Sequence, residues 1–263
     1  MHKRQRHLNI LQILANQKVV TVQDLTQRLK ASSATVRRDI NELAALFALK
    51  KVHGGAEALD TGERPKLDQV SFEYSNTINI EQKRAIAERA VMLCEDGDSI
   101  IINGGTTTYQ MIGFLEDRKL QILTNSLPIA NSLFERSRNR IQLPGGEVYR
   151  AQHIIVSPFE DDTIKNYYAS RLFMGAQALT PAGLLENDPR LVQAERKLLS
   201  QADQLVVLVD SSKFKQRGSL ILRPLDEIDI VITDDGIDAA AAEMLEDAGV
   251  ETIVVEAARS EAA

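Results

Sequence analysis

The chain has 263 residues, 44% of them hydrophobic, which is enough for one large domain or for a small domain joined to a medium one. It has one cysteine, no signal-like start and no apolar run near 18 residues, so we expect a soluble, cytoplasmic protein without intrachain disulfides or a membrane partner. The net charge of −6 hides an asymmetry, because residues 1–57 carry 10 basic and 4 acidic side chains and the remainder carries 21 and 33. A basic N-terminal part favours binding to a polyanion.

The basic part is predicted to contain three short helices followed by a hairpin. Apolar residues at three- and four-residue steps indicate a first helix over about 7–15. Thr21, with Asp24 three residues later, is a plausible N-cap for a second helix that ends near Lys30. Ser32 or Ser33 caps the third helix, and Gly54-Gly55 allows a tight turn in the segment 49–56. This order is typical of a winged helix-turn-helix domain.

The third helix is predicted to have one apolar and one basic face. Val36, Ile40, Leu43 and Phe47 fall on the side that faces the core. Guanidinium and amide groups on the opposite side suit contacts with phosphates and base edges. The alternative is a solvated basic face with Arg38 paired to Glu42. The residues expected to contact DNA are Thr21, Ser32, Ser33, Thr35, Arg37, Arg38, Asn41, Lys50, Lys51 and His53.

The rest of the chain alternates between predicted helices and strands. A polar segment with Gly62 and Pro65 indicates a linker. After a helix over 81–93, short apolar runs predict strands at 99–102, 120–123, 141–143, 172–174, 205–209, 228–232 and 252–255, with helices near 109–115, 127–136, 190–202 and 239–248. Alternation predicts a largely parallel sheet covered on both faces. We expect a winged helix-turn-helix domain at 1–58, a linker at 59–75, an α/β domain at 76–256 and a flexible tail at 257–263.

Four loops that follow predicted strands are rich in glycine and polar groups: 103–108, 124–126, 144–146 and 210–213. Glycine lets backbone N–H groups approach an anion, and hydroxyl groups add hydrogen-bond donors. Each loop alone is explained by a turn or a helix cap. Together, at the carboxyl ends of parallel strands, the loops favour a site for a phosphorylated polyol or sugar.

The segments Thr35-Val36-Arg37-Arg38-Asp39-Ile40 and His53-Gly54-Gly55-Ala56 resemble the DeoR family of bacterial transcription regulators, and the resemblance extends from about Arg4 to Val255. It implies a C-terminal sensor domain similar to the sugar-phosphate isomerase and CoA-transferase superfold. The positions that match the family's effector residues are Gly105, Thr106, Thr107, Thr124, Asn125, Gly145, Gly146, Glu195, Lys197, Asp210 and Lys213, with Asp188 as a weaker match. With Asn103, Thr108 and Ser126 from the same loops, they form the expected effector site.

One position departs from the family pattern. The family commonly has aspartate where this chain has Asn103. An amide repels an anionic group less than a carboxylate does, so we expect an effector that carries a carboxylate or enolate as well as a phosphate. The segments 103–106, 124–128 and 207–213 also resemble the ascorbate-utilisation repressor branch of the family.

The sequence therefore predicts a repressor of a carbohydrate-uptake or catabolic operon, acting as a dimer or tetramer on operator DNA. We expect no catalytic residues, cofactor or metal; His2 and His7 have no cysteine partners. A sugar-phosphate isomerase tethered to DNA is the alternative, with Asp210, Glu195 and Lys213 available for proton transfer. Cys94 is interpreted as a small buried hydrophobic residue, and His153, beside an apolar segment, as a structural or a surface residue rather than a base. An architectural nucleoid protein conflicts with the acidic body.

Overall fold

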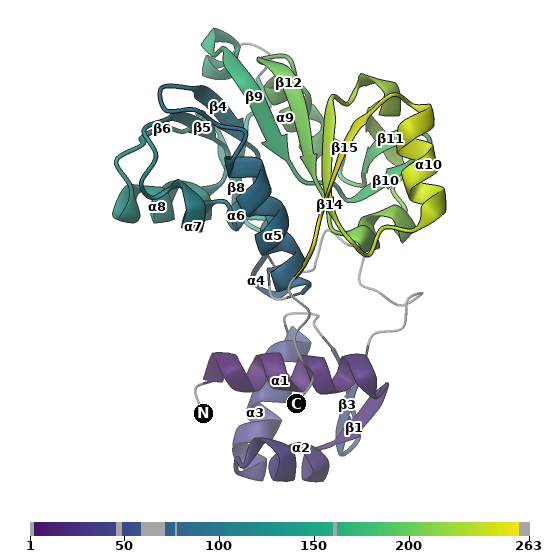
Figure 1. Ribbon diagram of the computed structural model, residues 1–263. Coiled ribbons are helices and arrows are strands. Elements are labelled where there is room, and N and C mark those ends of the chain that lie inside the picture. The colour runs from purple at the N-terminus through teal and green to yellow at the C-terminus, as the bar shows by residue number, and fades with distance from the viewer. Residues whose placement is uncertain (1–2, 46–48, 59–71, 77, 160–161, 258–263) are drawn as a thin grey trace. The chain divides into compact units, whose positions relative to one another are not determined.

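The computed structural model describes residues 3–45, 49–58, 72–76, 78–159 and 162–257 (Figure 1). The chain divides into two compact units, Met1–Ile78 and Asn79–Ala263. The predicted linker falls mostly, and Phe47 wholly, outside the described residues. Among the helices that are described, none is both long enough and apolar enough to span a membrane.

In its described residues, the first unit contains four helices and a small antiparallel sheet of strand order β1-β3-β2. Its elements are α1 (Lys3–Asn16), β1 (Val19–Thr21), α2 (Val22–Leu29), α3 (Ser33–Ala45), β2 (Lys50–Val52), β3 (Gly55–Glu57) and α4 (Phe72–Ser75). The capping box expected at Thr21 and Asp24 is present, with Asp24 N donating to Thr21 Oγ1 at 3.1 Å. Thr35 N donates to Ser32 Oγ, so Ser32 caps α3.

The core of this unit contains the apolar stripe predicted for the third helix. Val36, Ile40 and Leu43 are buried against Ile10 and Leu25 from α1 and α2. A buried carboxylate also joins α3 to α1. Asp39, which is 1% exposed, accepts from Arg6 Nε at 2.7 Å and from Arg6 Nη2 at 3.1 Å. These contacts fix which face of α3 is left outside.

The second unit contains a seven-stranded sheet, strand order β15-β14-β12-β9-β4-β5-β6, in which every pairing is parallel. The strands are β4 (Ser99–Ile102), β5 (Gln121–Thr124), β6 (Arg140–Gln142), β9 (Ala169–Met174), β12 (Ala202–Leu208), β14 (Ile230–Asp234) and β15 (Glu251–Val255). All seven predicted strands are present, within a few residues of the predicted bounds.

Helices cover both faces of this sheet, as the alternating pattern predicts (Figure 1). Ile100 and Ile102 of β4 pack with α5 (Ile80–Val91), α6 (Thr106–Tyr109), α7 (Ile112–Leu115) and α8 (Leu127–Arg136). Ile101, between them, packs with α9 (Pro189–Leu199) and α10 (Ala239–Asp247) on the opposite face. Cys94 is buried beside α5, where burial raises the pKa of its thiol to about 11.

Two further elements were not predicted. One is a hairpin of β7 (Glu147–Tyr149) and β8 (Ile154–Val156), and the other is an antiparallel sheet of β10 (Ala178–Thr180), β11 (Gly183–Glu186) and β13 (Leu220–Arg223). The predicted helix over 109–115 is wrong in detail, because two short helices, α6 and α7, cover that region. The helix predicted over 190–202 ends earlier, because β12 begins at Ala202.

Candidate functional site

The outer face of α3 carries the basic residues expected to contact DNA. Arg37, Arg38 and Asn41 are all exposed, on the side opposite the buried Asp39 and Ile40. The pairing of Arg38 with Glu42, which was the alternative to a DNA-binding face, is not found. The Glu42 carboxylate instead pairs with Lys3 at 2.7 Å, and Arg38 forms no ion pair with any described residue.

The remaining candidate DNA-contacting residues lie at the ends of α2 and α3 and on the hairpin. Thr21, Ser32 and Thr35 are engaged in capping, because Thr21 bonds Asp24 and the Ser32 and Thr35 hydroxyls lie 2.8 Å apart. Backbone N–H groups at such helix starts commonly contact phosphates. Ser33, Lys50, Lys51 and His53 are exposed, and Lys50 lies 3.8 Å from Glu57.

His7, Asp39 and Glu42 bring three metal-type ligand atoms within 4.8 Å of one another. Both carboxylates already have cationic partners, since Arg6 binds Asp39 and Lys3 binds Glu42. His7 Nε2 lies 3.1 Å from Asp39 and 3.4 Å from Glu42. We interpret this cluster as the ion-pair network that holds α1 against α3.

In the second unit, the loops after β4 and β5 bring together the polar residues predicted from the sequence. Asn103, Thr108, Thr124, Asn125 and Ser126 are each at most 2% exposed. The two loops are joined by a hydrogen bond from Gly104 N to Asn125 Oδ1 at 2.7 Å. Thr108 Oγ1 donates to the Asn103 carbonyl at 2.7 Å, which fixes the turn into α6. Gly105, Thr106 and Thr107 lie at the start of that helix.

Two buried side-chain atoms in these loops have no hydrogen-bond partner among the residues that the structure describes. They are Asn103 Oδ1, an acceptor, and Asn125 Nδ2, a donor. Buried polar groups are nearly always paired, so an unpaired one calls for a specific explanation. Here an acceptor and a donor come from neighbouring strand ends, which is where open parallel sheets bind ligands.

Glu195 on α9 faces this pair of loops. Asn103 Nδ2 donates to Glu195 Oε1 at 2.8 Å. Burial, together with the nearby carboxyl of Glu186, raises the pKa of Glu195 to about 8, against the effect of the Asn103 hydrogen bond. Burial also raises the pKa of Glu186. Glu195 is therefore mostly protonated and neutral at pH 7.

The end of β12 supplies a second group of charges. Asp210, 2% exposed, accepts hydrogen bonds from Ser212 and from Asn79 Nδ2, the latter at 2.8 Å. Lys83 of α5 is also buried, and burial lowers the pKa of its ammonium to about 8 although Asp210 attracts it. Lys213 lies close enough to lower this pKa further. Lys83 is thus within electrostatic range of one carboxylate, Asp210, and of a second ammonium, Lys213.

The sequence interpretation missed Lys83. The signal was present, because Lys83 precedes the buried Ile86, Ala87 and Ala90 by three, four and seven residues and so lies on the apolar face of α5. A lysine in that position is almost never buried unless it is paired. Asn79, one turn earlier on the same face, was missed as well.

Lys197 makes its hydrogen bonds on another side of α9 from Glu195, so its predicted place beside Glu195 in the effector site stays a prediction. Residues two apart on a helix point in nearly opposite directions, so Glu195 faces inward and Lys197 faces away. Lys197 Nζ pairs with Asp162 at 2.8 Å and donates to the carbonyls of Ser157 and Phe159. It anchors the segment that follows β8.

Asp188 has a largely structural role. Its carboxylate caps α9, binds Arg190 Nη2 at 2.7 Å and accepts from the Tyr149 hydroxyl at 2.9 Å, while the Arg190 guanidinium lies 4.5 Å from the Tyr149 ring. The hydrogen bond from the Arg190 side chain is the main reason that the pKa of Asp188 lies below its ordinary value. The residue thereby holds the hairpin β7–β8 against α9.

Gly145 and Gly146 begin that hairpin and are exposed. A Cβ on Gly146 would lie 2.4 Å from the Val156 carbonyl oxygen, so glycine is needed there for pairing within the hairpin. The hairpin in turn packs on the loops, with Ile155 N donating to the Asn125 carbonyl at 2.7 Å. His153, at φ 55°, contributes its carbonyl to Leu127 N, consistent with a structural role.

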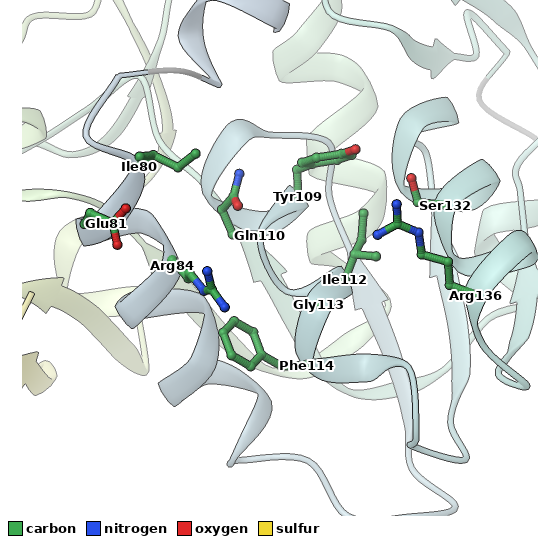
Figure 2. A pocket seen from close by; sticks show the side chains of 10 residues that line it. All are labelled: Ile80, Glu81, Arg84, Tyr109, Gln110, Ile112, Gly113, Phe114, Ser132 and Arg136. Atoms are coloured by element: carbon green, nitrogen blue, oxygen red, sulfur yellow. The ribbon is translucent and has the colours of Figure 1, made fainter. Parts of the chain in front are cut away.

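A separate pocket of about 230 Å³ lies among α5, α6, α7 and α8 (Figure 2). Figure 2 shows Arg84 beside the Phe114 ring and Arg136 projecting from α8 toward Ile112. Arg84 lies 5.8 Å from the ring centre. None of the residues that line this pocket is one of the predicted effector residues.

Comparisons with known proteins identify both units. Residues 6–62 match the family model described as the DeoR-like helix-turn-helix domain, and residues 78–235 match the DeoR C-terminal sensor domain. The chain therefore belongs to the DeoR family of transcription regulators, as the resemblance predicted.

Its relatives include the HTH-type transcriptional regulator UlaR of Shigella flexneri serotype 5b and that of Escherichia coli O1:K1. Each is 36% identical over 256 residues, covering 97% of this chain and 100% of the relative.

Some solved structures are similar to parts of this chain, at low sequence identity and low TM-score. Ribose 5-phosphate isomerase A from Methanocaldococcus jannaschii is 20% identical, with a TM-score of 0.39 over 51% of this chain and 54% of the isomerase chain. The translation factor eIF2B beta from Chaetomium thermophilum is 14% identical, with a TM-score of 0.40 over 87% of this chain and 77% of the factor.

Proposed function

We propose that this regulator represses a carbohydrate-uptake or catabolic operon, and that a phosphorylated sugar or sugar acid bound beyond the ends of β4, β5 and β12 changes its affinity for operator DNA. The unpaired Asn103 Oδ1 and Asn125 Nδ2 carry the proposal. Hydroxyl groups of a polyol donate and accept, so they satisfy both atoms. Each such atom left buried and unpaired costs about 1–3 kcal/mol, and a polyol removes that cost on binding.

The charges nearby favour an anionic effector. Asp210 attracts the buried ammonium of Lys83, Lys213 acts on both Lys83 and Glu186, and burial keeps Glu195 neutral at pH 7. A phosphate suits the ammonium groups of Lys83 and Lys213. A protonated Glu195 donates to a carboxylate or enolate, whereas an ionised carboxyl there would repel either group. This is the second reason, besides Asn103, to propose a sugar-acid phosphate.

Operator binding is assigned to the exposed face of α3, with Arg38 reading bases and Lys51 of the hairpin binding phosphates. One domain of this size offers few base contacts, so we propose a dimer or tetramer on repeated half-sites. The effector acts only if it binds the DNA-competent and DNA-incompetent arrangements with different affinities.

The test is operator binding by fluorescence anisotropy at fixed salt, with the DNA upstream of the protein's own gene and a scrambled duplex of equal length. Glucose 6-phosphate and 6-phosphogluconate are compared as ligands, with Arg38→Ala as the variant that should lose operator preference. We expect a specific complex whose affinity changes more with the sugar-acid phosphate. Equal responses to both ligands would refute the acid preference, and no response to any sugar phosphate would refute the effector site.

One observation favours a second candidate, an isomerase. Glu195 and Lys83 both have a pKa near 8, and catalytic acids and bases are often tuned in this way. An assay of aldose–ketose interconversion with pentose and hexose phosphates separates the two functions. We propose binding without turnover, so the wild-type protein and Glu195→Gln should both show only the background rate.

A further inference from the structure

Asn79 does not have the conformation that is usual for asparagine at the start of a helix. It is the N-cap of α5, where asparagine normally has an extended backbone and caps the helix with its side chain. Here its backbone is left-handed, at φ 51° and ψ 42°, and its side chain makes no capping hydrogen bond. Local rules tend to be broken at functional sites, where another contact compensates.

The compensating contact is with the predicted effector site. Asn79 Nδ2 donates to Asp210 Oδ1 at 2.8 Å, across 131 residues of sequence. Asn79 and Lys83 are one helical turn apart, joined by the hydrogen bond from Lys83 N to the Asn79 carbonyl at 3.0 Å, so both lie on the face of α5 toward Asp210. The first turn of α5 is thus built around a carboxylate that the effector is expected to use.

Asn79 also lies at the boundary between the two units, since the first ends at Ile78 and the second begins at Asn79. Asparagine tolerates the left-handed conformation better than other residues with a Cβ, but it still prefers right-handed or extended backbone. If the bond to Asp210 breaks, the backbone is free to leave this conformation. Such a change at residue 79 takes place where the chain passes from the first unit to the second.

We propose that, without ligand, the Asn79 amide occupies the position on Asp210 that a hydroxyl group of the effector takes, so that binding displaces Asn79 and releases the backbone at the boundary. An amide N–H and a sugar O–H are equivalent donors to a carboxylate oxygen. The effector and the side chain of Asn79 therefore compete for one acceptor. This inference rests on the proposed effector site, to which it adds the residue that reports occupancy.

A double-mutant cycle in ligand-free protein tests the contact directly. Operator Kd is measured for the full-length wild type, Asn79→Ala, Asp210→Ala and the double variant. We expect each single change to shift operator Kd in one common direction by about fivefold or more, within the range of allosteric couplings. The double variant should shift no further than the larger single change, because both remove the same bond. Wild-type affinity in Asn79→Ala, or additive effects, would overturn the inference.

Asn79→Gly distinguishes the effect of losing the side-chain amide from the effect of changing the backbone conformation. It also provides the test if Asp210→Ala does not fold. Glycine loses the amide but keeps the left-handed conformation accessible, so its shift should match that of Asn79→Ala in direction and be smaller. A shift of opposite sign, or none in either variant, contradicts the proposal. Asn131→Ala on α8 is the matched control, because Asn131 donates to Glu135 at 3.2 Å on the surface, and it should bind operator as the wild type does.

A second arm adds 6-phosphogluconate. The wild-type shift should have the same sign as that of ligand-free Asn79→Ala, and the ligand should bind Asn79→Ala more tightly by calorimetry because its competitor is gone. Opposite signs, or weaker binding to the variant, would refute displacement. If the wild type responds to no sugar phosphate, the effector proposal fails, whereas the ligand-free cycle still decides whether the Asn79–Asp210 bond controls operator affinity.

Discussion

Replacing Glu195 with glutamine should alter how the stability of the protein depends on pH. The pKa of Glu195 is about 8 in the folded protein, against an ordinary value of 4.5. Between these values the folded state holds a proton that the unfolded state has released, so the free energy of unfolding falls as pH rises. Glutamine keeps an oxygen for Asn103 Nδ2 and resembles the protonated acid, but it does not titrate.

The size of the effect follows from the width of that window. One proton over the three units from pH 5 to pH 8 corresponds to about 3–4 kcal/mol. Burial of Glu195, which is 7% exposed, leaves little solvent screening to reduce this figure. Lys83 acts in a different window: its pKa, lowered from 10.5 to about 8, makes stability rise with pH between those values. Lys83 and Glu186 remain in both proteins, so their direct contributions largely cancel in the difference.

The assay is urea unfolding followed by far-UV circular dichroism at half-unit steps from pH 5 to pH 8.5, because the chain has no tryptophan. The difference in unfolding free energy, wild type minus Glu195→Gln, should fall steadily to pH 8 and then level off. Glu243→Gln, on the exposed face of α10, is the control: its free energy of unfolding should change with pH in the same way as that of the wild type. If the free energy of unfolding of Glu195→Gln also changes with pH as the wild type does, Glu195 is ionised in the folded protein. That result would refute the proposal that a neutral Glu195 allows an anion to bind beside it.

Three predictions concern the DNA-binding unit. Arg38→Ala should weaken binding to the operator by about 1–3 kcal/mol and leave binding to scrambled DNA nearly unchanged, if Arg38 reads a base. Lys51→Ala should weaken both equally and reduce the salt slope of log K by about one; identical, sequence-blind losses in the two variants would refute this division of roles. Gly55→Ala should place a Cβ 2.2 Å from the Val20 carbonyl oxygen and unpair β1 from β3. We expect it to destabilise the unit by about 2 kcal/mol or more, seen as a lower thermal midpoint, and an unchanged midpoint would contradict the pairing.

The sequence was sufficient to predict those parts of the fold where burial is periodic. Val36, Ile40 and Leu43 repeat at helical steps, and every strand of the parallel sheet except β6 contains a short apolar run. The sheet of β10, β11 and β13 has a weaker signal, because only β13 contains an apolar run of three residues, Leu220-Ile221-Leu222. Its strands have three or four residues each and pair across distances of up to about forty positions, so tertiary contacts rather than local pattern define them.

Strand order alone was enough to predict which of the candidate site residues lie together. The loops after β4 and β5 follow adjacent parallel strands, so Asn103 and Asn125 had to meet. Side-chain direction was harder to predict. Glu195 and Lys197 match the family pattern equally well, but the register of α9 turns only Glu195 toward Asn103. Asn79 and Lys83 join the site through the packing of α5 against the sheet, which depends on contacts between distant segments.

The departure at Asn103 now has a structural reason. Glu186 and Glu195 already place two carboxyl groups in one buried region, and the pKa of each is raised. An aspartate at position 103 would add a third carboxyl within hydrogen-bonding distance of Glu195, because Asn103 Nδ2 lies 2.8 Å from it. Like charges at that spacing cannot all ionise, so protonation there would depend on which ligand is bound. With asparagine, one neutral amide and one protonated acid lie at the proposed effector site, so we expect an anionic effector to meet no negative charge from these two side chains.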